Sequence, residues 1–219
     1  MARTGTSDRG VAGTSDRGAE GGDAEPVPPG GLARNQAARR RRVIDATLRL
    51  AAAGGFDAVQ MRDVAAEAEV AVGTVYRYFA SKERLLLEAM AEQQANLRAH
   101  VIRHPPQGGT PAERVAHVLQ RANRALRRHP DVTAAMVRAF GSAQVENADV
   151  VRGVTGIMTD IITRAIHGDE ERDATAHELR VARVLMQVWL SSLNGWVCGV
   201  DGPDRVDDDL DAAARALLD

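Results

Sequence analysis

Apolar residues that recur at alternating spacings of three and four most strongly constrain the fold of this 219-residue chain. The longest such segment is 174–200, and one stripe of it comprises Leu179, Ala182, Met186, Trp189, Leu193, Trp196 and Val200. A second stripe comprises Val181, Leu185, Val188, Ser192, Gly195 and Gly199. This spacing follows one face of an α-helix, and a helix with two apolar stripes is buried on two sides. The segment therefore predicts a body of several packed helices.

Glycine and proline breaks divide the rest of the chain into further helical segments. We predict another helix that begins at residue 82, after the N-cap Ser81, and further helices over 35–53, 61–68, 72–78, 111–128, 131–140, 148–167 and 204–218. The expected fold is all-α, with an N-terminal three-helix domain at 34–80 that contains a helix–turn–helix. Residues 81–219 are expected to form a C-terminal helical domain for ligand binding and dimerisation. Residues 1–33 repeat the string Gly-Thr-Ser-Asp-Arg-Gly and are predicted to form a disordered arm.

The charge distribution favours a nucleic-acid partner, although the net charge of the whole chain is −2. Residues 34–99 carry 11 cations against 8 acids, whereas residues 100–219 carry 14 cations against 17 acids. A basic module on an acidic body is typical of a DNA-binding protein that has a separate second domain.

The sequence offers no sign of an enzyme, a metal protein or a membrane protein. It contains no nucleophile elbow, phosphate-binding glycine loop or zinc motif, so we expect no catalytic residue, metal or cofactor. His100 and His104 have the spacing of a metal-binding pair, but Pro105 ends their helix and a solvated pair is expected. The single Cys198 cannot form an internal disulfide and is expected to be a packed thiol in a cytoplasmic protein. No run of about 18 apolar residues predicts a membrane span.

Both tyrosines and the only lysine of the chain lie between residues 76 and 82. The segments 61–68 and 72–78 have the proportions of a helix–turn–helix, whose second helix reads DNA. Gly73 weakens that helix by about 1 kcal/mol relative to Ala, but it lets the backbone approach a duplex. Hydroxyl and cationic side chains suit phosphates and base edges. The candidate DNA-binding residues are Arg39, Arg40, Arg62, Val72, Gly73, Thr74, Tyr76, Arg77, Tyr78 and Lys82.

Two less specific interpretations of these residues stay open. A helical scaffold that binds no DNA is one, although it leaves the cluster of tyrosines and lysine unexplained. The other concerns the run from Arg39 to Arg42, which fits a solvated helix face as well as contacts to phosphates or to an adjacent minor groove.

Residues 35–90 resemble the DNA-binding domain of TetR-family transcriptional repressors. The resemblance rests on Gly55-Phe56-Asp57-Ala58, Met61-Arg62-Asp63-Val64-Ala65 and Val72-Gly73-Thr74-Val75-Tyr76-Arg77-Tyr78-Phe79 with Ser81-Lys82-Glu83. It implies contacts to operator DNA from Arg62, Val72, Gly73, Thr74, Tyr76, Tyr78 and Lys82.

Two positions depart from the pattern of this family. Gln60 stands in place of the usual Thr or Ser that caps the second helix, so a weaker cap is expected. Glu69 stands in place of the usual turn glycine, and a positive φ at this residue would be unfavourable by about 1 kcal/mol.

Within this family, the segments 59–64 and 184–196 are most similar to actinobacterial repressors of cholesterol catabolism. The similarity implies a helical pocket for a steroid or fatty acyl-CoA thioester that releases DNA, and control of lipid or sterol catabolism genes. The alternative is a regulator of drug efflux or of other metabolism that responds to an unrelated small molecule. Methionines suit an adaptable pocket but also fill ordinary cores. The candidate ligand-binding residues are Met90, Leu97, Met136, Phe140, Met158, Ile162, Trp189 and Leu193.

The last two helices of each subunit are expected to pair as a four-helix bundle in a homodimer. The candidate dimerisation residues are Val188, Ser192, Gly195, Trp196, Leu210 and Leu217. Trp189 and Trp196 fit core or dimer packing as well as ligand contact, and both interpretations stay open. A twofold dimer places its reading helices about 34 Å apart, so the expected operator is an inverted repeat in double-stranded DNA.

Overall fold

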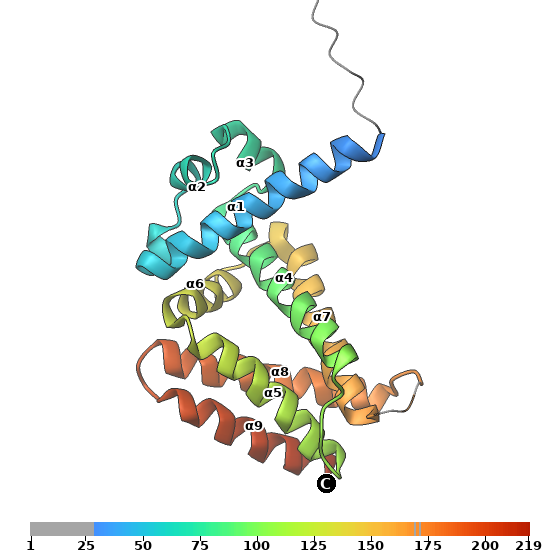
Figure 1. The fold of residues 1–219 in the computed structure, drawn as a ribbon. Coiled ribbons are helices and arrows are strands. Elements are labelled where there is room, and N and C mark those ends of the chain that lie inside the picture. The colour runs from blue at the N-terminus through green and yellow to red at the C-terminus, as the bar shows by residue number, and fades with distance from the viewer. Residues whose placement is uncertain (1–28, 169, 171) are drawn as a thin grey trace, which may run out of the picture.

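A computed structural model describes residues 29–168, 170 and 172–219 of the chain. Within these residues every regular element is helical, which confirms the predicted all-α class (Figure 1). The elements in chain order are α1 (Pro29–Ala58), α2 (Met61–Glu67), α3 (Val72–Tyr78), α4 (Lys82–Arg103), α5 (Pro111–Arg127), α6 (Pro130–Gly141), the 3₁₀ helix η1 (Val145–Asn147), α7 (Ala148–His167), α8 (Ala176–Val197) and α9 (Pro203–Leu218).

Helix α1 differs most from its predicted bounds, because it begins at Pro29 and not near residue 35. The rest of the predicted disordered arm lies outside the described residues. The glycine pair interrupts the helix as expected: Gly54 is extended, with φ of −167°, and Gly55 has a positive φ of 67°. A short helical piece then reaches Ala58. The two glycines therefore redirect the chain toward α2.

Three helices begin with side-chain caps that the sequence specifies. The Ser81 hydroxyl accepts a hydrogen bond from the Arg84 backbone N–H at 3.2 Å, which confirms the predicted start of α4. Thr110 and Glu113 form a capping box at the start of α5, and a second capping box begins α8. Each cap satisfies backbone N–H groups that have no partner inside the helix.

The helices form two ends joined by long connecting helices (Figure 1). Helices α2 and α3 lie beside α1 at one end, whereas α5, α8 and α9 lie at the other, with α4 and α7 running between them. Helix α6 belongs to the first end by its packing, since its buried residues Val132, Ala135 and Met136 share one core cluster with α1–α4. The division at residue 80 stays a prediction, because α4 and α6 pack across it.

Cys198 is exposed, so the expectation of a packed thiol is wrong. Its position at the C-terminal end of α8 places it beside the turn into α9, where solvent reaches it.

None of the described helices combines the length and the apolar character needed to cross a bilayer.

Candidate DNA-reading surface and effector cavity

Helix α3 presents one anchoring face and one open face. Val75 is completely buried against the core, whereas Tyr76 is 53% exposed and Arg77 is exposed. Residues three and four apart share a helix face, so fixing Val75 inward turns Gly73, Tyr76 and Arg77 away from the core. The exposed face therefore consists of a glycine, a phenol and a cation, as the sequence predicted.

Gly73 has no structural need to be glycine. Its φ is not positive, and a Cβ at this position would meet no atom within 4 Å in the described part of the chain. Alanine would fit and would favour the helix. The bare backbone is therefore available for close approach by another molecule.

The turn between α2 and α3 is built around Glu69 in a left-handed conformation, with φ of 54°. The Val70 N–H donates to the Ala65 carbonyl at 3.0 Å, and the Glu69 N–H donates to the Ala66 carbonyl at 3.1 Å. These two bonds form a Schellman motif, which glycine normally occupies at its left-handed position. The positive φ considered from the sequence is therefore present, with a glutamate that bears the strain.

Gln60 occupies the N-cap position of α2 without a side-chain cap, in line with the weaker cap expected from the sequence. Within the described residues its side chain makes no capping bond to α2 and instead donates from Nε2 to the Asp57 carbonyl at 2.9 Å. The first-turn Arg62 is exposed beside the free N–H groups of the helix. This combination leaves the N-terminal end of α2 open to an anion.

Two of the cationic candidates, Arg40 and Lys82, form hydrogen bonds within the described part of the chain. Arg40 donates to Glu88 at 2.7 Å and also lies 3.6 Å from Glu92, which ties α1 to α4. Lys82 donates to the Phe56 carbonyl at 3.4 Å and lies over the Phe56 ring. Arg39 is exposed. The geometry thus favours a structural role for Arg40 and leaves Arg39 facing solvent.

A largely apolar cavity lies among α4, α5, α6, α7 and α8, with an empty volume of about 760 Å³ including its open mouth. No charged residue lines it within the described part of the chain. The lining residues are Met90, Gln93, Gln94, Leu97, Ala122, Ala125, Leu126, Met136, Phe140, Val154, Met158, Met186, Trp189, Leu190 and Leu193. Concave apolar sites with few polar groups typically bind small hydrophobic molecules.

A basic groove lies between α4 and α5. His100 lies one turn beyond the cavity-lining Leu97, and the groove is also lined by His104, His117 and Arg121. The His100 and His104 rings stack with centroids 4.4 Å apart. Burial and the nearby Arg121 lower the pKa of His100. No set of three or more potential metal ligands occurs in the described ranges. The guanidinium of Arg121 is the group of this groove that suits an anion.

Comparisons with known proteins match both ends of the chain. Residues 43–89 match the family described as bacterial regulatory proteins, tetR family, and residues 108–217 match the tetracyclin repressor-like C-terminal domain. The HTH-type transcriptional repressor KstR of Mycolicibacterium smegmatis is 41% identical over 183 residues, which cover 84% of this chain and 88% of that protein. The chain belongs to the TetR family. The identification made from the sequence is thereby confirmed, and the chain is a DNA-binding transcriptional regulator and not an enzyme.

Further relatives agree with this assignment. KstR of Mycobacterium tuberculosis is 39% identical over 183 residues, covering 84% of this TetR-family chain and 82% of the relative. The crystal structure of a TetR regulator from Rhodococcus sp. RHA1 has a TM-score of 0.76 at 29% identity, covering 84% of this chain and 97% of that one. FadR of Bacillus subtilis shares the fold, with a TM-score of 0.58 at 19% identity, covering 81% of this chain and 97% of that one.

The cavity of this TetR-family regulator contains most of the residues predicted for the ligand pocket. Met90, Leu97, Met136, Phe140, Met158, Trp189 and Leu193 all line it. Ile162 does not: it is completely buried within the core cluster that packs α5, α7, α8 and α9. The α5 wall, formed by Ala122, Ala125 and Leu126, was not predicted, because apolar residues on a helix carry no signal that distinguishes a cavity from a core. Gln94, Met186 and Leu190 also line the cavity and were not predicted, although their helical faces were visible in the sequence.

One predicted dimerisation residue needs correction, and two others have contacts within the chain. Leu210 is completely buried in the core of its own subunit and so does not lie on a dimer surface. The Ser192 hydroxyl donates to Asp209 of α9 at 2.8 Å. A Cβ on Gly195 would approach Asp201 to 2.9 Å, in the turn between α8 and α9. The small residues of α8 thus serve close packing within the chain, whereas Val188, Trp196 and Leu217 are partly buried.

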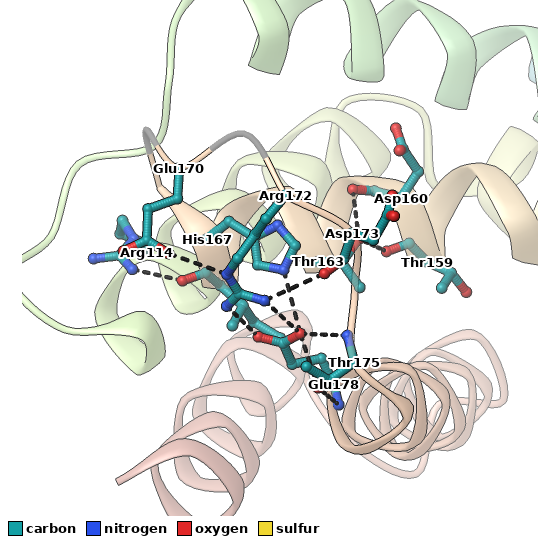
Figure 2. Close-up of polar contacts among 11 residues, drawn as sticks. Arg114, Thr159, Asp160, Thr163, His167, Glu170, Arg172, Asp173, Thr175 and Glu178 are labelled. Carbon is teal, nitrogen blue, oxygen red and sulfur yellow. Dashed lines mark hydrogen bonds and ion pairs between the residues drawn. The ribbon is translucent and has the colours of Figure 1, made fainter.

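A separate cluster of polar side chains lies where the chain passes from α7 to α8 (Figure 2). The buried Glu178 accepts hydrogen bonds from Arg172 at 2.6 and 3.1 Å and from the Thr175 backbone at 2.7 Å. His167 Nε2 lies 3.3 Å from the same carboxylate. The guanidinium of Arg172 holds the pKa of Glu178 well below its usual range. Since the carboxylate is already satisfied, the cluster is explained by its structural role.

Proposed function

We propose that this TetR-family regulator represses genes of lipid or sterol catabolism as a cytoplasmic homodimer that binds an inverted-repeat operator. One observation carries the proposal: helix α4 begins beside the DNA-reading helix and continues as a wall of the apolar cavity. A hydrophobic effector in the cavity therefore contacts the same helix that positions the reading domain. The proposed outcome of effector binding is release from DNA.

The DNA contacts are proposed for the open side of the α2–α3 unit. Tyr76, Arg77 and Arg62 supply hydroxyl and guanidinium groups for phosphates, and Thr74 and the Gly73 backbone approach the bases. The remaining proposed contacts are Arg39, Val72, Tyr78 and Lys82. Support comes from the exposure of Tyr76 and Val72, two large side chains that the fold does not bury.

We propose that coupling between the cavity and the DNA-reading domain runs along α4, from the cavity-lining residues to its first turn. Arg84 in its first turn donates to both carboxylate oxygens of Asp149 in α7, at 3.0 and 2.7 Å. Met90 and Leu97, further along α4, line the cavity. An effector that binds better to a conformation with displaced α4 shifts the population away from the DNA-competent state.

The effector is proposed to be amphiphilic, with an apolar body and an anionic head group. The uncharged cavity suits the body of a steroid or fatty acyl chain, and the neighbouring groove at His100, His117 and Arg121 suits the phosphates of coenzyme A. The Bacillus subtilis FadR structure, which has the same fold, is a complex with stearoyl-CoA. Together with the similarity to KstR repressors, this supports acyl-CoA thioesters as the effector class.

The deciding experiment measures operator binding by fluorescence anisotropy while acyl-CoA thioesters are added. A steroid acyl-CoA, a fatty acyl-CoA, the corresponding free acids and coenzyme A alone form the series. Release by the steroid or fatty thioester, but not by coenzyme A alone, is expected. If none of the lipids releases the operator but an unrelated drug does, the regulator controls efflux or other metabolism and the lipid assignment is wrong.

A further inference from the structure

Two buried polar atoms on residues that line the apolar cavity have no hydrogen-bond partner within the described part of the chain. They are Nε1 of Trp189, on α8, and Oε1 of Gln94, on α4. Both residues line the cavity, and Trp189 is only 8% exposed. A buried polar atom without a partner is unfavourable, and each such atom in a folded protein calls for an explanation.

The other buried atoms of this kind are explained by the side chains that carry them. Asn123 lacks a partner for Oδ1, yet its Nδ2 donates to Asp207 at 2.8 Å. Arg127 lacks a partner for Nε, yet its terminal nitrogens donate to Asp204 and Asp207, both at 2.7 Å. An indole has a single polar atom, Nε1–H, which only donates. The indole N–H of Trp189, its one polar group, therefore has no hydrogen-bond partner among the described residues.

Packing alone does not require these polar atoms. Phenylalanine would fill much of the same apolar space as Trp189, and leucine or methionine would fill that of Gln94, without burying an unsatisfied group. Both atoms belong to residues that line the apolar cavity, on α4 and α8. A partner that enters the cavity is the explanation that accounts for both positions.

We propose that Trp189 and Gln94 determine which effectors this regulator recognises, by hydrogen bonding to oxygen or nitrogen groups within the effector's apolar body. This inference rests on the proposed function, since it concerns the same cavity. The Trp189 Nε1–H donates to a carbonyl oxygen, such as a ring ketone or the thioester carbonyl. The Gln94 Oε1 accepts from a hydroxyl or an amide N–H. A plain hydrocarbon body would leave both atoms unpaired.

The proposal predicts discrimination between ligands that differ by one carbonyl. A site built to hydrogen-bond a polar group rejects an analogue that lacks it, because its own buried group is then left unpaired. Acyl-CoA thioesters with a carbonyl in the apolar body are therefore expected to bind at least about tenfold more tightly than the matched deoxy compounds, a difference of about 1.4 kcal/mol.

The test is a thermodynamic cycle with direct binding measured by calorimetry. The ligands are two matched pairs: steroid acyl-CoAs with and without a ring ketone, and an acyl-CoA thioester with its thioether analogue. In Trp189→Phe the preference for the carbonyl member of one pair should disappear, so that the two members of that pair bind with about equal affinity. In Trp196→Phe, the same chemical change at a position outside the cavity lining, the preference should persist. Gln94→Met is tested with one added pair, a hydroxylated steroid acyl-CoA and its deoxy form, and should abolish the preference for the hydroxylated member.

Two further readouts separate this inference from packing and from the proposed function. Thermal unfolding of Trp189→Phe without ligand should occur at or above the wild-type temperature, because an unsatisfied donor is removed. Equal weakening of both members of every pair would show that Trp189 only packs, and would overturn the inference. Carbonyl-dependent binding that fails to release operator DNA would contradict the proposed function and leave the inference intact. Absence of binding by all of these ligands would contradict both.

Discussion

The ammonium nitrogen of Lys82 lies 4.1 Å from the centre of the Phe56 ring and 3.4 Å from the Phe56 carbonyl oxygen. The guanidinium of Arg138, from α6, lies 4.4 Å from the same ring centre and pairs with Asp57 at 2.9 Å. One aromatic ring after the glycine kink of α1 thus contacts the first residue of α4 and the middle of α6. Such cation–π contacts each contribute about 0.5–1 kcal/mol at exposed sites.

Lys82 is therefore the residue where a DNA contact and an internal contact must be told apart. If Lys82 contacts a phosphate, Lys82→Ala reduces the slope of log K against log salt by about 0.9, the value for one released counterion. Lys82→Arg keeps the charge and should preserve the slope. A weaker affinity with an unchanged slope would mean that Lys82 acts only by fixing Phe56.

Gly73→Ala should stabilise the protein while weakening operator binding. The new Cβ meets open space, so helix propensity should raise the unfolding free energy by about 0.5–1 kcal/mol. The matched control is Gly156→Ala in α7, which also meets open space and is remote from α3. Both variants should gain stability in urea unfolding, but only Gly73→Ala should lose DNA affinity. Unchanged affinity would remove Gly73 from the reading surface.

Glu69→Gly should relieve the strained turn of the helix–turn–helix. The left-handed conformation is unfavourable for a residue with a side chain by about 1 kcal/mol, and the greater freedom of glycine in the unfolded chain offsets part of the gain. Glu69→Ala keeps the positive φ and serves as the control. Denaturant midpoints should rise for glycine alone. Equal midpoints for the two variants would show that the turn relaxes by another route.

Acid should destabilise the protein through Glu178. Its pKa is held well below the ordinary value of 4.5 by Arg172, so its contribution is present above that pH and is lost as pH falls below it. Asp149 acts in the same direction, since Arg84 lowers its pKa to about 2. Between pH 7 and pH 3, the melting temperature of the wild type should fall mainly below pH 4.5.

Glu178→Gln tests which carboxylate dominates this acid response. The variant should melt at a lower temperature at pH 7 and show a flatter decline toward pH 3. Glu170→Gln removes an exposed partner of the same arginine and should behave like wild type. An unchanged pH profile in Glu178→Gln would contradict the role given to this carboxylate.

Arg121→Glu should weaken the response to acyl-CoA thioesters by placing a negative charge in the basic groove. Loss of one charge-assisted contact to phosphate corresponds to roughly a tenfold weaker affinity, or about 1.4 kcal/mol. Arg124→Glu makes the same charge change on the same helix but lines neither the groove nor the cavity. Operator release by a free acid should be less affected than release by the thioester. Equal effects of the two substitutions would rule out a specific head-group site.

The sequence by itself determined the elements whose signals are local. Ser81 marks the start of α4 because its hydroxyl caps the next turn, and the apolar spacing around Val75 fixes which face of α3 is anchored. The strained Glu69 was also visible, since the turn geometry depends on backbone bonds between neighbours in sequence. These effects act over one or two helical turns, so the residues alone carry them.

Only the tertiary structure decided which apolar faces line a cavity and which fill the core. Met158 and Ile162 are one turn apart on the same helix, yet one lines the cavity and the other is sealed in the core. Leu210 and Ser192 looked available for a second subunit but pack within their own chain. Periodicity specifies that a face is buried, but the partner is set by how distant helices converge, because hydrophobic burial has no direction of its own.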